Sequence, residues 1–138
     1  MSYVHRAASQ KIQDIWGAVD SSSVAHVMVD VQRGFCDPAH APQNASTDMD
    51  AVASRIANLQ SAFHGAGTRS VIVYFDDLRE GYDRAMGGPH KISSNQVDLI
   101  VAKRHQSAFE DTTLADELRA RGVSHLLLSG FYADMCVT

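Results

Sequence analysis

Three side chains that could cooperate in nucleophilic catalysis stand at or just past the ends of apolar runs in the sequence: Asp30, Lys103 and Cys136. A thiol reacts through its thiolate, so a catalytic cysteine needs a base beside it or a lowered pKa. Asp30 could accept the thiol proton, while Lys103 could stabilise the thiolate and keep a buried Asp30 ionised. The three residues therefore predict thiol chemistry if the fold brings them together.

The segments that lead to these residues have the character of buried strands. Residues 24–31, 70–75, 97–103 and 124–130 are short, rich in apolar side chains and nearly continuous in that character. Helical segments between successive strands favour a parallel α/β sheet with right-handed crossovers. In such sheets reactive groups gather at the carboxyl ends of the strands, which is where an acid, a lysine and a thiol are expected to meet.

The connecting segments carry weaker but readable signals. Residues 49–67 place apolar side chains at helical spacing and end in glycines, and residues 112–122 predict an amphipathic helix with a threonine cap and a terminal glycine. The first 20 residues could form another helix. The polar, glycine-bearing stretch 76–96 predicts an irregular connection with one short helical turn.

Composition narrows the class of protein. The 138 residues are 45% hydrophobic and 20% charged, with a net charge of −4, which predicts a single soluble globular domain. Lysines and arginines are scattered rather than clustered, so a nucleic-acid partner is not expected. No apolar run approaches the roughly 20 residues of a membrane span, and the N-terminus lacks a signal-peptide core. We expect a cytoplasmic protein with a small-molecule substrate and no membrane partner.

The cysteines and histidines favour neither a disulfide nor a metal site. Cys36 and Cys136 lie far apart in the sequence, and cytosolic thiols stay reduced. No paired cysteine or histidine spacing is present, and the seven histidines occur singly. We therefore expect no cofactor and no metal, and we interpret Cys36 as a spectator.

Two blocks carry a family resemblance. The stretches "VMVDVQRGFCDP" and "VAKRHQSAFEDTTLADELRARGVSHLLLSGFYADMCVT", in this order, resemble the isochorismatase-like cysteine hydrolases from about position 22 to the end. The resemblance implies an Asp-Lys-Cys triad at Asp30, Lys103 and Cys136. It also implies a three-layer α/β/α fold around a Rossmann-like parallel sheet, and a homo-oligomer, either a dimer or a tetramer.

The same resemblance implies a mechanism. It places a non-proline cis peptide bond between Phe131 and Tyr132, which would aim the backbone N–H groups of Tyr132 and Cys136 at a developing oxyanion. The reaction would be hydrolysis of an amide-type C–N bond in a small molecule through a thioester intermediate. The nicotinamidase branch carries a D-x-H pair that is absent here, which again argues against a metal.

Several residues are expected around the triad in supporting roles. Gln32, Phe35, Tyr74 and Tyr132 are predicted to contribute to the substrate pocket, with the Gln32 amide holding a loop and the Phe35 ring forming a wall. Residues 107–109 are predicted to form a turn that positions Lys103 rather than to react.

Two other functions remain open at this level. "GFYAD" resembles the isochorismatase branch, which cleaves a vinyl ether by protonation from an aspartate and needs no nucleophile. "MCV" resembles the amidase-type members, and we favour a thiol hydrolase because a reactive cysteine without a use would be a liability. The third possibility is an inactive interaction module on the same fold.

The end of the sequence raises a separate expectation. The chain stops two residues after Cys136, whereas the resemblance implies the rest of a helix, at least one more strand and a closing helix. We expect residues 1–138 to be one hydrolase domain that is incomplete at its C-terminus, as a fragment of a longer protein. Completion by a second polypeptide or swapped subunit, and a natural inactive remnant, are the alternatives.

Overall fold

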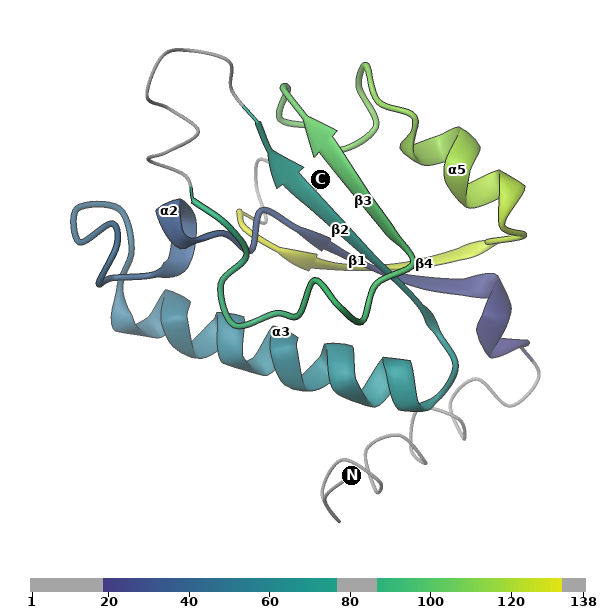
Figure 1. The fold of residues 1–138 in the computed structure, drawn as a ribbon, viewed down its shortest axis with the longest axis horizontal. Coiled ribbons are helices and arrows are strands. Elements are labelled where there is room, and N and C mark those ends of the chain that lie inside the picture. Colours follow the sequence, from purple (N-terminus) through teal and green to yellow (C-terminus); the bar gives the residue numbers. More distant parts are fainter. Residues whose placement is uncertain (1–18, 77–86, 133–138) are drawn as a thin grey trace.

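The computed structural model describes residues 19–76 and 87–132 (Figure 1). Three sequence predictions fall wholly or largely outside the described residues: the N-terminal helix, residues 77–86 of the irregular connection, and the helix expected at Cys136.

Four parallel strands form one sheet, as the sequence predicts. They are β1 (Val24–Val29), β2 (Arg69–Phe75), β3 (Leu99–Lys103) and β4 (His125–Gly130). Among the described residues the strand order is β3-β2-β1-β4, and every pair is parallel. All six residues of β1 are buried because the strand lies inside the sheet with both faces covered.

The long helix α3 (Thr47–Gly65) connects β1 to β2 along one face of the sheet (Figure 1). It begins at an N-cap, where the Ser46 hydroxyl accepts a hydrogen bond from the Met49 backbone N–H at 3.3 Å. The chain leaves the helix through Gly67, whose φ of +80° is accessible to glycine at little cost. The glycine stop is the one that the sequence predicts, whereas the Ser46 cap was not among its predictions.

The helix α5 (Leu114–Ala120) lies on the opposite face and buries Leu114 and Leu118. The predicted threonine cap is only partly correct. Thr113 occupies the cap position, but its side chain makes no capping hydrogen bond. Instead, the hydroxyl of Thr112, one residue before the cap position, accepts a hydrogen bond from the Leu114 N–H at 3.4 Å.

The two faces of the sheet carry separate apolar clusters, one under α3 and one under α5. The described part of the chain therefore has the predicted three layers, with the sheet between helices. Alternate strand residues face α3 or α5 because side chains along a strand point to opposite sides. Met28 and Ile72 pack with Ala53 and Ile56 of α3. The other cluster contains Val27, Val71 and Val101 with Leu114 and Leu118 of α5.

The strand β4 has the apolar character of a buried strand but lies at an edge of the described sheet. It pairs with β1, and among the described residues no strand lies on its other side. Leu126 is 39% exposed and Leu128 is 43% exposed, although both are strongly apolar. An apolar run indicates a preference for burial, whereas burial itself depends on what packs against the strand.

Residues 87–98 cross the α3 side of the sheet without regular secondary structure. The short helix α2 (Arg33–Cys36) lies beside the start of this segment. An isolated β-bridge between Gln32, just before α2, and Pro89 joins the two. A 3-10 turn, η1 (Ser21–Ser23), precedes β1. None of the helices in the described part of the chain has the length and apolar character required to cross a bilayer.

His26 is a buried titratable residue in β1. Its Nε2 lies 2.8 Å from the Ser129 hydroxyl of β4, and its ring packs 4.8 Å from the ring of Phe63. Burial disfavours the imidazolium and lowers the pKa of His26 to about 4. The folded protein therefore holds this side chain neutral at neutral pH.

The depressed pKa of His26 makes stability depend on pH. Between pH 6.5 and 4 the unfolded chain protonates His26 and the folded chain does not, so the free energy of unfolding should fall by about 3 kcal/mol as the pH is lowered. Urea titrations across this range should show the loss, and His26→Gln should remove it. The exposed His64→Gln should retain it. An equal slope in His26→Gln and the wild type would contradict the assignment.

Candidate functional site

Asp30 immediately follows β1 and is fully buried. Its φ of +57° is unusual for a residue other than glycine, although aspartate tolerates this region better than most. The backbone N–H of Asp30 donates to the Val73 carbonyl of β2 at 2.9 Å. This bond holds the turn after β1 against the neighbouring strand and directs the carboxylate at the end of the sheet.

Lys103, the last residue of β3, reaches the same point. Its Nζ lies 3.0 Å from Asp30 Oδ2, and both side chains are fully buried. The ammonium group also donates to the carbonyls of His105 at 3.2 Å and Gln106 at 2.8 Å. These three oxygen partners match the three N–H donors of a lysine, so the group is held as a cation with a fixed direction.

The turn after β3 positions Lys103 differently from the sequence prediction. Residues 107–109 were expected to hold the lysine, but the carbonyls that contact it belong to His105 and Gln106. Ala108 joins the apolar core, and Phe109 is largely exposed. Backbone carbonyls have no side-chain signature, so these two contacts could not be predicted from the order of residues.

An aromatic row borders the ion pair. The ring of Phe75, the last residue of β2, lies 5.4 Å from Lys103 Nζ. Phe35 packs edge-on against Phe75 at 6.4 Å and against Tyr132 at 5.9 Å between ring centroids. The predicted residues Phe35 and Tyr132 thus meet each other, and sequence reasoning did not include Phe75. Phe75 could have been predicted to lie near the ion pair, because it ends β2, the strand between β1 and β3.

Gln32 holds a loop, as the sequence predicts. Its side-chain oxygen accepts from the Phe75 N–H at 2.7 Å. Its side-chain nitrogen donates to the carbonyls of Phe75 at 3.2 Å and Gly87 at 3.3 Å. The amide therefore ties the segment after β1 to the end of β2 and to the start of the 87–98 segment.

The end of β4 approaches β1 closely. A Cβ added to Gly130 would lie 2.0 Å from the Val29 carbonyl oxygen, so only glycine fits there. The Phe131 N–H donates to that same carbonyl at 3.1 Å. The peptide bond between Phe131 and Tyr132 is cis, which confirms that prediction. Cys136, four residues further on, lies outside the described residues, so the predicted triad is described for Asp30 and Lys103 only.

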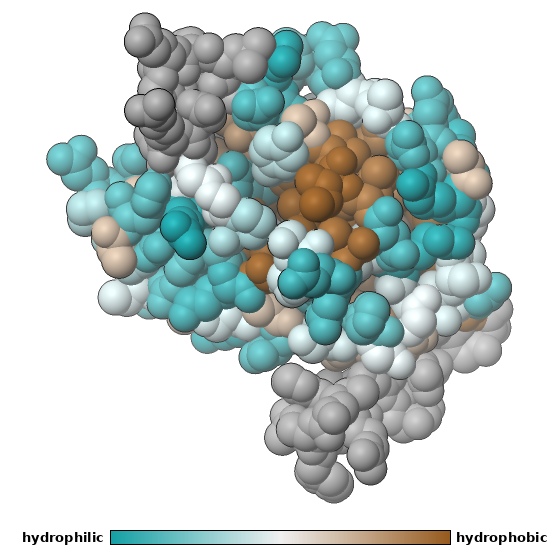
Figure 2. Space-filling view, in the orientation of Figure 1, coloured by the Kyte–Doolittle hydropathy of each residue, from teal (hydrophilic) through white to brown (hydrophobic). Residues whose placement is uncertain are grey.

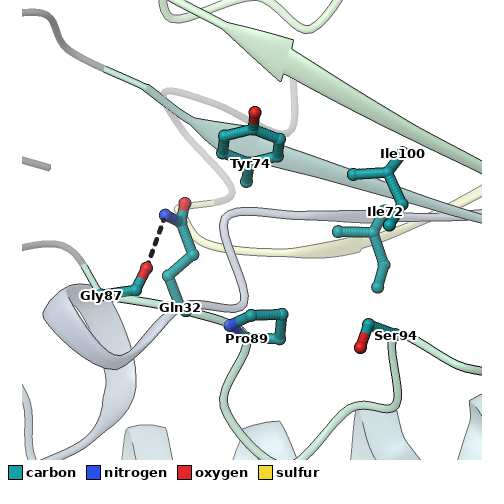
Figure 3. A pocket seen from close by; sticks show the side chains of 8 residues that line it. Gln32, Ile72, Tyr74, Gly87, Pro89, Ser94 and Ile100 are labelled. Atoms are coloured by element: carbon teal, nitrogen blue, oxygen red, sulfur yellow. Dashed lines mark hydrogen bonds between the residues drawn. The ribbon is translucent and has the colours of Figure 1, made fainter.

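A cavity of about 290 Å³ lies on the α3 side of the sheet, and neither Asp30 nor Lys103 lines it. Figure 3 shows the side chains around it, which come from β2, β3, the 87–98 segment and, with Gln32, the segment after β1. Of the four predicted pocket residues, Gln32 and Tyr74 line this cavity. Phe35 and Tyr132, among the described residues, are not part of its lining. The structure therefore divides the predicted pocket into two places.

Cys36 has the environment of an unreactive thiol. It is buried, and its Sγ donates to the Gln32 carbonyl at 3.1 Å. Burial, with the nearby carboxylates of Asp37 and Asp50, raises the pKa of Cys36 to about 12. Within the described ranges, no group of three or more histidine, cysteine or acidic side chains has an arrangement that could hold a metal ion.

Comparison with known proteins finds a matching family model and curated relatives. Residues 24–138 match the isochorismatase domain. The chain is 26% identical to the ureidoacrylate amidohydrolase RutB of Variovorax paradoxus (strain S110), over 87% of this chain and 62% of that protein. The chain spans 60–68% of the length of the curated relatives of this kind that it matches.

Solved structures share the fold at low identity. A candidate isochorismatase hydrolase from Oleispira antarctica superposes with a TM-score of 0.72 and 22% identity, covering 86% of this chain and 66% of that one. N-carbamoylsarcosine amidase from Thermoplasma acidophilum superposes with a TM-score of 0.65 and 21% identity, covering 83% of this chain and 70% of that one.

The buried ion pair should contribute strongly to stability. Lys103→Met leaves the Asp30 carboxylate buried without its cation, so we expect a loss of about 3–5 kcal/mol in the free energy of unfolding. Adding Asp30→Asn should recover part of that loss. Arg119→Ala breaks an exposed pair with Asp116 and should cost less than about 1 kcal/mol. Equal losses in Lys103→Met and Arg119→Ala would contradict this account of the pair.

Proposed function

This chain belongs to the isochorismatase domain family, and from that premise we propose that it hydrolyses an amide-type C–N bond in a small molecule. In this proposal Cys136 is the nucleophile, Asp30 is the proton acceptor and donor, and Lys103 is the fixed positive charge. The observation that carries the proposal is the buried contact of 3.0 Å between Lys103 and Asp30 at the carboxyl ends of the strands.

The first half of the reaction forms a thioester. Asp30 takes the proton of the Cys136 thiol, and the thiolate attacks the carbonyl carbon of the amide. The backbone N–H groups of Tyr132 and Cys136 would donate to the oxyanion that forms. The protonated Asp30 then gives its proton to the amine nitrogen as the C–N bond breaks. The second half reverses these roles, with water replacing the thiol and the acid and free thiol as products.

The contacts of Lys103 support an electrostatic role rather than proton transfer. Its ammonium is directed at Asp30 and two backbone carbonyls, so its charge stays beside the carboxylate throughout. A neighbouring cation favours the ionised form of an acid. Once Asp30 has taken the thiol proton, the same cation therefore favours its release to the leaving amine.

The relatives suggest where to look for the substrate. One is named for ureidoacrylate and another for N-carbamoylsarcosine, and both names describe compounds with a carbamoyl group on nitrogen. Small ureido and N-carbamoyl acids are therefore the first amides to test. A homo-oligomer and a cytoplasmic location stay predictions, as does the assignment of residues 1–138 to one domain.

The two cysteines should differ in reactivity. At pH 7 iodoacetamide should label Cys136 much faster than Cys36, since burial raises the pKa of Cys36 to about 12 and leaves almost no thiolate. Mass spectrometry of the digested protein measures both rates in one sample. Asp30→Asn should slow labelling of Cys136 without changing Cys36. Equal, slow labelling of the two thiols would count strongly against the proposal.

Substitution of the nucleophile tests the reaction class. With ureidoacrylate or an N-carbamoyl amino acid as substrate, Cys136→Ala and Asp30→Asn should each reduce ammonia release by roughly a thousandfold or more. The matched control is Cys36→Ala, which should retain the wild-type rate. If Cys136→Ala kept its turnover of a vinyl-ether substrate while Asp30→Asn lost it, the protein would be an ether hydrolase instead.

A further inference from the structure

We propose that the cavity on the α3 side of the sheet is a second binding site, which takes a small, uncharged molecule built around one apolar ring. The site is formed by Ile72 and Tyr74 of β2, Ile100 of β3, Gln32, and Pro89 and Ser94 of the 87–98 segment (Figure 3). Asp30 and Lys103 do not line it, so the inference does not depend on the proposed reaction.

The cavity lies on the opposite side of β2 from the ion pair. Ile72 and Tyr74 alternate with Val71 and Val73, which belong to the cluster under α5. Ile72 pairs in register with Ile100, so the side chains of these two residues share one face. The backbone of β2 therefore separates the cavity from the apolar cluster on the α5 side.

Two buried glutamines hold the covering segment at a fixed distance from the sheet. At one end Gln32 donates to the Gly87 carbonyl, as described above. Further along, Gln60 of α3 donates to the Ser93 carbonyl at 2.7 Å and accepts from the Ser93 N–H at 2.8 Å. Both glutamine side chains are buried, and moving the segment would leave their amides unpaired, at a cost. The cavity is therefore built into the fold rather than left by loose packing.

The walls select for an uncharged ligand. Among the described residues no charged side chain lines the cavity, and most of the lining is apolar. A charged group entering it would lose hydration without gaining a partner, whereas an apolar ring would gain contacts with Ile72, Ile100 and the Tyr74 ring. Ser94 lines one side of the cavity (Figure 3).

Size and access complete the description of the ligand class. A cavity of about 290 Å³ is at the lower limit of the range for drug-sized molecules, so a single ring is the appropriate size. Ile100 is 50% exposed, which leaves the β3 side open to solvent. Figure 2 shows an apolar patch framed by hydrophilic residues on this face, in the region of β2 and β3.

Phenol and benzoate form a matched pair of probes, because they share a ring but only benzoate is charged at pH 7. Ligand-observed NMR titration of the chain should give saturable phenol binding in the millimolar range, as expected for so small a ligand. Benzoate should bind roughly tenfold more weakly or not at all.

Variants locate the binding. Ser94→Trp fills the cavity from an exposed position, and Ile100→Asp places a charge at its open side; each should weaken phenol binding roughly tenfold or more. Leu128→Trp and Leu128→Asp change a similarly exposed apolar residue of β4 and should leave binding unaltered. Thermal unfolding of each variant establishes that it remains folded.

Three results would overturn the inference: no saturable phenol binding, equal binding of phenol and benzoate, or full binding by a folded Ser94→Trp variant. Light scattering supplies a fourth. If the wild type were an oligomer that Ile100→Asp dissociates and Leu128→Asp does not, this face would be an interface between copies instead of a ligand site.

Discussion

The rest of the structure depends on one buried ion pair, Asp30 with Lys103. Neither charge could be buried alone without a large desolvation cost, so each requires the other. They come from strands on either side of β2, which means that the pair forms only when all three strands are in register. The same requirement explains the turn after β3, where two backbone carbonyls saturate the ammonium group. Folding of the sheet and assembly of the site are therefore one event.

The two faces of the sheet differ in polarity: one has a buried ion pair at the strand ends and the other an apolar cavity. At the end of the sheet, Lys103 shares the α5-facing strand pattern of Val101 and meets a carboxylate and the ring of Phe75. The α3 side has an apolar cavity under an irregular segment. Gln32 contacts both regions, since its amide bonds to Phe75 and to the segment that covers the cavity. The hydrogen bonds of this polar side chain thus hold the loops together, as backbone hydrogen bonds hold the strands of the sheet.

Cys36 shows how the surroundings of a thiol, rather than its residue type, determine its reactivity. Cys36 is enclosed by apolar side chains, donates to a backbone carbonyl and has two carboxylates nearby, all of which disfavour its thiolate. Cys136 comes six residues after the end of β4 in the sequence and lies outside the described residues.

The sequence by itself determined the four strands and the two main helices, because apolar periodicity and helix stop signals are local. It also predicted that Asp30 and Lys103 meet, because strand ends lie at one edge of a parallel sheet. It also determined the family, through two motifs in a fixed order. It could not set the burial of β4, since the exposure of Leu126 and Leu128 depends on neighbours rather than on apolar character. Only the tertiary structure placed Phe75 beside the ammonium, supplied the carbonyls of His105 and Gln106, and separated Tyr74 from Phe35 and Tyr132. These features are distances between segments far apart in the chain or contacts made by backbone atoms. Neither kind of contact can be predicted from the order of side chains along the sequence.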